Sequence, residues 1–176
     1  MTETVRVVRE PLENRFSRDR HLPALITLLN SYLLWGGSRI YRLRYGVGIN
    51  EWRILGELSI WPGATAAKAA VDLGINKAIV SRACASLVEK GLIVSESSGR
   101  ARRLYLTDRG VATFDEIRPV AAEREEVLLD GLTPEEVETL RDLLHRLVEN
   151  SDHLRDYDDA MLGGVPADDL DDEADD

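Results

Sequence analysis

Basic, hydroxyl and amide side chains gather in one segment of the 176-residue chain, between Thr65 and Gly110. The segment contains the strings LGINKAIVSR, LVEKGLI and GRARRLYLTDRG, in that order. Arginine and lysine bind phosphates and guanine edges, and Ser, Thr and Asn hydrogen-bond to the same groups. The segment therefore has the side chains of a nucleic-acid contact, and the elements around it must position them.

The spacing of apolar residues predicts two short helices followed by a β-hairpin in this segment. The first helix runs from Thr65 to Leu73, and Gly74 supplies a left-handed turn residue. Asn76 is a suitable N-cap for the second helix, which ends near Lys90. We expect the hairpin strands at 92–94 and 104–106, with the turn at 97–99. Helix, turn, helix and basic hairpin form a winged helix-turn-helix, with the helix-turn-helix at about 65–90 and the wing at about 92–106.

The second helix of the motif has an apolar and a polar face. The predicted buried residues, at i, i+4, i+7 and i+8 spacing, are Val80, Cys84, Leu87 and Val88. The opposite face carries Lys77, Ser81, Arg82, Ala85 and Glu89. This polar face is the one that a major groove could receive.

Helices are also predicted on both sides of the motif. A stretch from Pro23 to Tyr45 has apolar residues on more than one face, which predicts burial on more than one side. Asn50 is the expected N-cap of the next helix. Beyond the wing, Thr107 opens a long helix, and Thr133-Pro134-Glu135-Glu136 is a capping sequence for a last helix with a near-heptad leucine stripe.

The predicted fold class is mainly α with a small β-hairpin, in three parts. Residues 1–20 form a flexible arm, 21–155 form a winged-helix domain, and 156–176 form a disordered acidic tail. Within the domain, the segments at about 22–45 and 107–154 are the candidate dimerisation helices.

The net charge of −10 is unevenly distributed. Residues 152–176 hold 11 acidic residues and one basic residue, whereas 76–110 hold seven basic and three acidic residues. The motif is therefore basic inside an acidic protein. The acidic tail has three open interpretations: a solubility tail, a DNA mimic that competes for the basic face, or a partner-binding segment.

Several other functions find no support in the sequence. The single cysteine, Cys84, falls on the buried face of a helix, which favours an inert thiol over a redox sensor. The three histidines are scattered, so we expect no metal site, and no motif indicates a cofactor or an enzyme. No apolar run is long enough to span a bilayer and the N-terminus does not resemble a signal peptide, so we expect a cytoplasmic protein without membrane contact.

The quoted strings, with GINEWRILGEL at 48–58, resemble the multiple-antibiotic-resistance regulator (MarR) family over residues 22 to 154. The resemblance implies a homodimer whose first and last helices interlock and which binds a pseudo-palindromic double-stranded DNA operator. It also implies a ligand-responsive transcriptional regulator, and we expect a repressor. Arg100 matches a family arginine that enters the minor groove. Ser98 stands where the family usually has Asp, so the carboxylate that would brace this arginine is missing.

The predicted DNA contacts lie on the helix-turn-helix and the wing. Ser81 and Arg82 are expected to contact bases or phosphates. Asn76 and Lys77 lie at a helix N-terminus that favours phosphate, although Asn76 can serve only as a cap. A phosphate contact of Thr65 is left open. In the wing, Arg100 is expected in the minor groove and Arg102 at a phosphate, while Arg103 either contacts DNA or pairs with Glu96.

An aromatic cluster predicts a candidate effector pocket. Its residues are Tyr32, Trp35, Arg39 and Trp52, which would suit a small aromatic acid or its acyl thioester in the place where the family tends to bind effectors. The alternative is that these side chains serve only core or dimer packing.

A second function is also consistent with the sequence. The acidic C-terminal third and Ser98 would fit a winged-helix protein-interaction module that no longer reads DNA.

Overall fold

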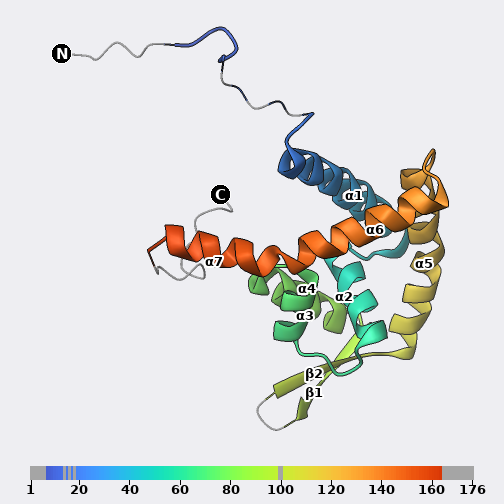
Figure 1. The fold of residues 1–176 in the computed structure, drawn as a ribbon. Helices are drawn as coiled ribbons and strands as arrows, with labels where there is room; N and C mark the ends of the chain where they lie inside the picture. Colours follow the sequence, from blue (N-terminus) through green and yellow to red (C-terminus); the bar gives the residue numbers. More distant parts are fainter. Residues whose placement is uncertain (1–6, 14, 16, 18, 99–100, 164–176) are drawn as a thin grey trace. The chain divides into compact units, whose positions relative to one another are not determined.

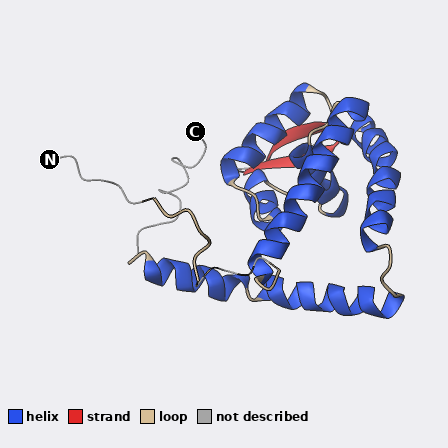
Figure 2. Cartoon of the chain, turned by 90° about the horizontal axis from the view of Figure 1, so that it is seen from above, coloured by secondary structure: helices blue, strands red, loops and turns tan. Residues whose placement is uncertain are grey.

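The computed structural model describes residues 7–13, 15, 17, 19–98 and 101–163, except for the side chain of Ser98. Its elements, in chain order, are α1 (Leu22–Tyr45), α2 (Ile49–Ile60), α3 (Ala66–Leu73), α4 (Lys77–Glu89), β1 (Ile93–Ser98), β2 (Ala101–Leu106), α5 (Asp108–Leu129), α6 (Pro134–Glu149) and α7 (Ser151–Met161) (Figure 1). The predicted class, mainly α with one small hairpin, is confirmed, and Figure 2 shows the two strands among the helices.

The chain divides into two compact units, the first ending at Glu123 and the second beginning at Arg124. The first holds α1 to α4, the hairpin and most of α5. The second holds the end of α5 with α6 and α7. Each unit is described by itself.

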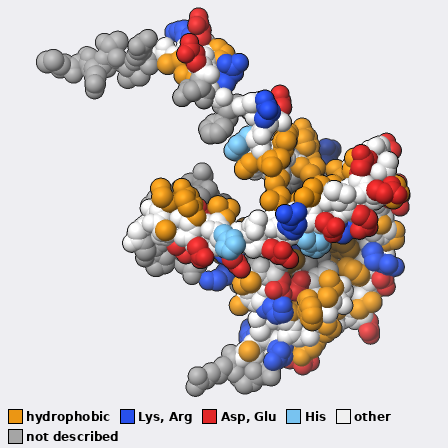
Figure 3. All heavy atoms as spheres, in the orientation of Figure 1, with side chains coloured by type: hydrophobic (Ala, Val, Ile, Leu, Met, Phe, Trp, Pro, Cys, Tyr) orange, Lys and Arg blue, Asp and Glu red, His pale blue; other side chains and the backbone are white. Residues whose placement is uncertain are grey.

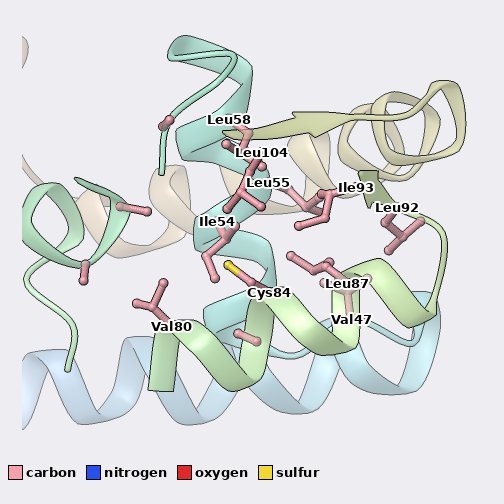
Figure 4. Packing of buried hydrophobic residues seen from close by; sticks show 14 of the residues in the cluster. Val47, Ile54, Leu55, Leu58, Val80, Cys84, Leu87, Leu92, Ile93 and Leu104 are labelled. Atoms are coloured by element: carbon pink, nitrogen blue, oxygen red, sulfur yellow. The ribbon is translucent and has the colours of Figure 1, made fainter. Parts of the chain in front are cut away.

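The core of the first unit is built around α2. Ile54, Leu55 and Leu58 are fully buried there and face Val80, Cys84 and Leu87 of α4 (Figure 4). Ile93 and Leu104 of the hairpin close the same cluster. Ala69 and Ala70 are buried side chains of α3, and their small size lets this helix lie close to its neighbours.

Local capping explains several helix boundaries. Thr65 caps α3 by accepting from the Lys68 N–H at 3.1 Å, and Asn76 caps α4 by accepting from the Ala78 N–H at 2.7 Å, as predicted. Thr133 and Glu136 form the predicted capping box of α6.

Four sequence-based expectations need correction. The N-cap of α2 is Gly48 rather than Asn50, because the Glu51 carboxylate reaches back to the Gly48 N–H. Val88 is exposed, since it lies past the edge of the buried face of α4. Both wing strands are longer than expected, so the turn moves to 99–100, outside the described residues. Residues 156–161 are helical in α7, so a disordered tail cannot begin at 156, and 164–176 lie outside the described residues.

A buried carboxyl group lies between α2 and α3. The Glu57 residue is only 7% exposed, and its Oε1 has no hydrogen-bond partner among the described residues. Burial raises the pKa of Glu57, and the hydrogen bond and negative charge of Asp72 raise it further, against the opposing charge of Lys68. Asp72 in turn pairs with Lys68 on α3. The folded state therefore favours a protonated Glu57.

Replacing Glu57 by Gln should make stability less dependent on pH. A raised carboxyl pKa stabilises the fold fully below the ordinary glutamate pKa, and this stabilisation is lost as pH rises through the raised value. Glu57→Gln keeps a neutral hydrogen-bonding side chain at every pH, so its Tm should exceed that of the wild type at pH 7–8. The difference should shrink as pH falls below about 4.3, the ordinary glutamate pKa.

Thermal unfolding followed by circular dichroism between pH 4 and 8 measures this difference. Glu116→Gln, at an exposed site on α5, is the matched control and should change the profile little. A lower Tm for Glu57→Gln at pH 8 would show that ionised Glu57 stabilises the α2–α3 contact.

Candidate nucleic-acid interface

The α4 helix presents one polar face to solvent because its other face is in the core. Val80, Ala83, Cys84 and Leu87 are buried, and the exposed residues are Lys77, Ser81, Arg82, Ala85 and Glu89, as the sequence predicted. Burial raises the pKa of the Cys84 thiol, so this thiol is held in its unreactive protonated form. The polar face projects from a helix that is held rigidly by the core.

The turn before α4 fixes where that face begins. Gly74 has φ of +59°, and the Ile75 N–H donates to the Ala70 carbonyl at 3.0 Å. Nη2 of Arg53, from α2, donates to the Leu73 carbonyl at 2.5 Å. The C-terminus of α3 is therefore tied to α2.

The end of α4 is tied to the loop between α1 and α2. Nζ of Lys90 donates to the Gly46 carbonyl at 2.8 Å and to both Glu51 oxygens at 2.6 and 2.7 Å. Burial alone would raise the pKa of Glu51, but hydrogen bonds from Lys90, Ser86 and the Gly48 N–H outweigh it, and the pKa is lowered. The sequence analysis did not identify this Glu51–Lys90 pair, because its partners are 39 residues apart and no local pattern joins them.

The wing is braced by the loop between α2 and α3. The Gly63 N–H donates to the Leu104 carbonyl at 2.8 Å, and the Leu104 N–H donates to the Ala64 carbonyl at 3.1 Å. The Arg103 guanidinium adds a 3.2 Å hydrogen bond to the Gly63 carbonyl. Gly63 has φ of +85°, and a Cβ there would lie 3.0 Å from the Tyr105 hydroxyl, so a larger residue would be both strained and crowded.

The base of the wing meets the first turn of α5 at the Leu92 carbonyl. This oxygen accepts the Thr107 N–H at 3.1 Å, and the Thr107 hydroxyl, which lies 2.8 Å from the Gly91 carbonyl and 3.2 Å from that of Leu92, can donate to either. The same hydroxyl caps α5 by accepting the Gly110 N–H at 3.0 Å. A Cβ at Gly110 would overlap the Leu92 oxygen and lie 3.0 Å from its carbon. The Leu-Thr-x-x-Gly string is therefore a requirement for close backbone approach.

The structure places the predicted DNA-contact residues on adjoining elements, but not all in equivalent states. Lys77, Ser81, Arg82 and Arg102 are exposed. Thr65 and Asn76 use their side-chain oxygens as caps. Arg103 lies opposite Glu96 in the hairpin and donates to Gly63. Arg100 lies outside the described residues.

The four predicted effector residues are not brought together. Trp35 and Arg39 line an open surface hollow of about 670 Å³ on α1, with Gly36, Ser38, Arg42 and Leu43. Trp52 instead packs in the core, with its ring centroid 5.7 Å from Tyr41 and 5.0 Å from Phe114. Tyr32 is exposed and is not among the lining residues. Sequence reasoning missed Arg42, which its spacing of three residues from Arg39 on one helix face could have indicated.

Comparisons with known proteins agree with this geometry. The MarR-family model matches residues 45–104. A MarR/EmrR family transcriptional regulator from Acinetobacter sp. ADP1 is 32% identical, with a TM-score of 0.74 over 78% of this chain and 99% of its own. The chain belongs to the MarR family of transcriptional regulators.

Two further relatives place the chain within the family. An uncharacterized HTH-type transcriptional regulator of Bacillus subtilis (strain 168), YybA, is 30% identical over 99 residues, which are 54% of this chain and 66% of that relative. MepR of S. aureus, solved in complex with DNA, has the same fold, with a TM-score of 0.66 and 19% identity over 76% of this chain and 99% of its own.

Two searches of the described residues gave negative results. None of the described helices is long and apolar enough to cross a membrane. Over the same part of the chain, no group of three or more His, Cys, Asp or Glu residues is arranged to hold a metal ion.

Replacing Gly110 by Ala should destabilise the domain by about 3 kcal/mol, because the added methyl forces α5 away from the Leu92 carbonyl. Gly56→Ala is the matched control: its Cβ would meet Phe114 at an ordinary 4.0 Å and should leave stability unchanged or slightly raised. Denaturant unfolding gives both values. A loss below about 0.5 kcal/mol for Gly110→Ala, which is typical of a neutral surface substitution, would contradict the role given to this approach.

Proposed function

We propose that this MarR-family protein is a cytoplasmic homodimer that binds a pseudo-palindromic double-stranded DNA operator and represses transcription from it. The observation that carries the proposal is the exposed face of α4, where Lys77, Ser81 and Arg82 project from a helix whose opposite face is buried. In a dimer, two such helices would enter major grooves about 34 Å apart.

Each side chain in the interface has a chemical task. Arg82 can bond O6 and N7 of a guanine with two parallel hydrogen bonds, and Ser81 can contact a base edge or a phosphate. Lys77, at the N-terminus of α4, supplies a charge for a phosphate where the helix dipole also favours one. Arg102 serves a phosphate beside the wing, and Arg100 reaches into the minor groove. We give Arg103 mainly a bracing role, because it already donates to Gly63.

The overall acidity of the chain does not oppose this function. Seven basic and three acidic residues lie within 76–110, so the surface that meets DNA is locally positive. Affinity from phosphate contacts should therefore fall steeply with salt concentration, whereas the base contacts of α4 give sequence selectivity.

The dimer in this proposal is formed by α1 and the C-terminal helices. Leu25, Ile26 and Leu29 of α1 are exposed in the chain, as are Leu143 and Leu147 of α6. Apolar side chains gather visibly on α1 (Figure 3). Exposed apolar helix faces of this size are typical of protein–protein interfaces.

The hollow on α1 is the proposed effector site. Trp35, 82% exposed, offers a broad apolar surface, and Arg39 and Arg42 can bind a carboxylate. A small aromatic acid, or its acyl thioester, would suit these groups. It would relieve repression only if it bound the DNA-free conformation more tightly than the DNA-bound one.

Arg82→Ala should weaken operator binding by roughly 1–3 kcal/mol, because one bidentate base contact is lost. An operator is first selected from random duplexes with the wild-type protein, and affinity is then measured by gel shift. Arg118→Ala, at an exposed arginine on α5, controls for loss of charge. If the wild-type protein selects no sequence, or Arg82→Ala binds as tightly as the control, the interface fails, and the protein-interaction module becomes the better interpretation.

Arg39→Ala should abolish the response to an aromatic carboxylate. Benzoate, 4-hydroxybenzoate and benzoyl thioesters are tested as probes, with Tm and operator release as measurements. Binding should raise the Tm of the wild type, and Arg44→Ala, an exposed arginine outside the hollow, should respond in the same way. An equal response of Arg39→Ala and wild type would show that any effector binds elsewhere.

A further inference from the structure

The helices α6 and α7 carry one continuous apolar stripe that is not buried in the chain. Leu140, Leu147, Leu154 and Met161 recur every seven residues, and Leu143 and Tyr157 follow two of them by three. All six side chains are exposed, and neither helix contains a buried residue. Only Asn150, itself in helical conformation, separates α6 from α7.

Such a stripe needs a partner. An isolated helix of the length of α7, 11 residues, is only marginally stable in water, because propensity alone rarely outweighs the cost of nucleation. Helices of this kind are stabilised by packing an amphipathic face, and apolar residues at heptad spacing are suited to a second helix.

The α1 helix carries a matching stripe. Leu22, Leu29 and Leu43 are exposed and lie at heptad positions, with Leu25 and Ile26 beside the first two. From Leu22 to Leu43 is 21 residues, and from Leu140 to Met161 is also 21. At 1.5 Å per residue, each stripe is about 32 Å long. The two stripes are therefore equal in length and similar in character.

Charge and helix dipoles select both the partner and its direction. The α7 helix has four aspartates and one arginine, whereas α1 has three arginines and no acidic residue. Two α7 helices would therefore repel each other. Asp156, Asp158 and Asp159 lie at the C-terminal half of α7, where the dipole disfavours them, and the first turn of α1 has no acidic residue of its own. Antiparallel packing places these aspartates beside the positive end of α1.

We propose that α7 extends the dimer interface by packing antiparallel on α1 of a second copy, with Met161 opposite Leu22 and Leu154 opposite Leu29. The same register places Leu140 of α6 opposite Leu43, so the whole of both stripes is covered. This inference rests on the homodimer of the proposed function. It adds an interface helix and a register that the dimer alone does not specify.

Cysteine crosslinking between two distinguishable copies tests the register. In a Cys84→Ala background, a tagged chain with Met161→Cys is mixed with an untagged chain with Leu22→Cys and oxidised mildly. A mixed disulfide is expected for this pair and for Leu154→Cys with Leu29→Cys. The crossed pairs, Met161→Cys with Leu29→Cys and Leu154→Cys with Leu22→Cys, are the matched controls and should form little product.

The possible products discriminate between arrangements. Preferential crosslinking of the crossed pairs would indicate the parallel direction and overturn the proposed register. Preferential Met161→Cys self-crosslinking would indicate α7 against α7. If a chain that carries both Met161→Cys and Leu22→Cys forms only an internal disulfide at high dilution, α7 packs within its own chain, and the second copy is excluded.

Sedimentation equilibrium separates this inference from the proposed function. The double variant Leu154→Asp/Met161→Asp should raise the dimer Kd by roughly tenfold or more, since two apolar contacts are lost. Asp152→Asn/Asp156→Asn, in the same helix but off the stripe, should not weaken the dimer. A wild-type dimer that binds its operator, with an unchanged Kd in the double variant, overturns only the role of α7. A monomeric wild type overturns the proposed dimer and this inference together.

Discussion

The geometry of the DNA-facing lobe depends on the close approach of α5 to the backbone carbonyl of Leu92. Leu92 follows α4 directly, and its N–H donates to the Leu87 carbonyl at 2.9 Å. Its carbonyl then accepts the Thr107 N–H, and Gly110 permits the contact because it has no Cβ. One short stretch of backbone thus links the end of α4, the base of the wing and the start of α5. The position of the wing relative to the polar face of α4 follows from this link.

The two ends of α4 are held by different kinds of interaction. At its start, Asn76 supplies a local cap. At its end, the partly buried Glu51–Lys90 pair binds it to the loop after α1. Burying an ion pair contributes little net stability, but removing one partner leaves a charge without compensation. The pair is therefore better understood as a constraint on where α4 ends than as a source of stability. It also provides a path by which a change at the C-terminus of α1 reaches α4.

The sequence predicted those features that depend on neighbours in the chain. Thr65, Asn76 and Thr133 were recognised as caps because a cap acts within three residues, and the polar face of α4 followed from helical period alone. Features that join distant segments were missed or misplaced. Trp52 was expected in a ligand pocket but stacks on Phe114, which is 62 residues away in the chain. Asn50 was a reasonable cap by residue type, but Glu51, which binds back to Gly48, moves the helix start. The Ser98 departure in the wing drew attention to a missing carboxylate, whereas the described bracing comes from backbone at Gly63 and Ala64.

The α2 helix explains how a small core can orient both helices of the motif. Its apolar side, with Ile54, Leu55 and Leu58, supplies most of the burial and hence most of the stability. Its polar side supplies direction: Arg53 binds the end of α3, and Glu51 binds the end of α4. Apolar contacts alone would tolerate small rotations of either helix, since they are not directional, whereas these hydrogen bonds specify one arrangement. A carboxyl group such as Glu57, which burial disfavours when it is ionised, is consistent with a surface on which orientation matters more than maximal stability.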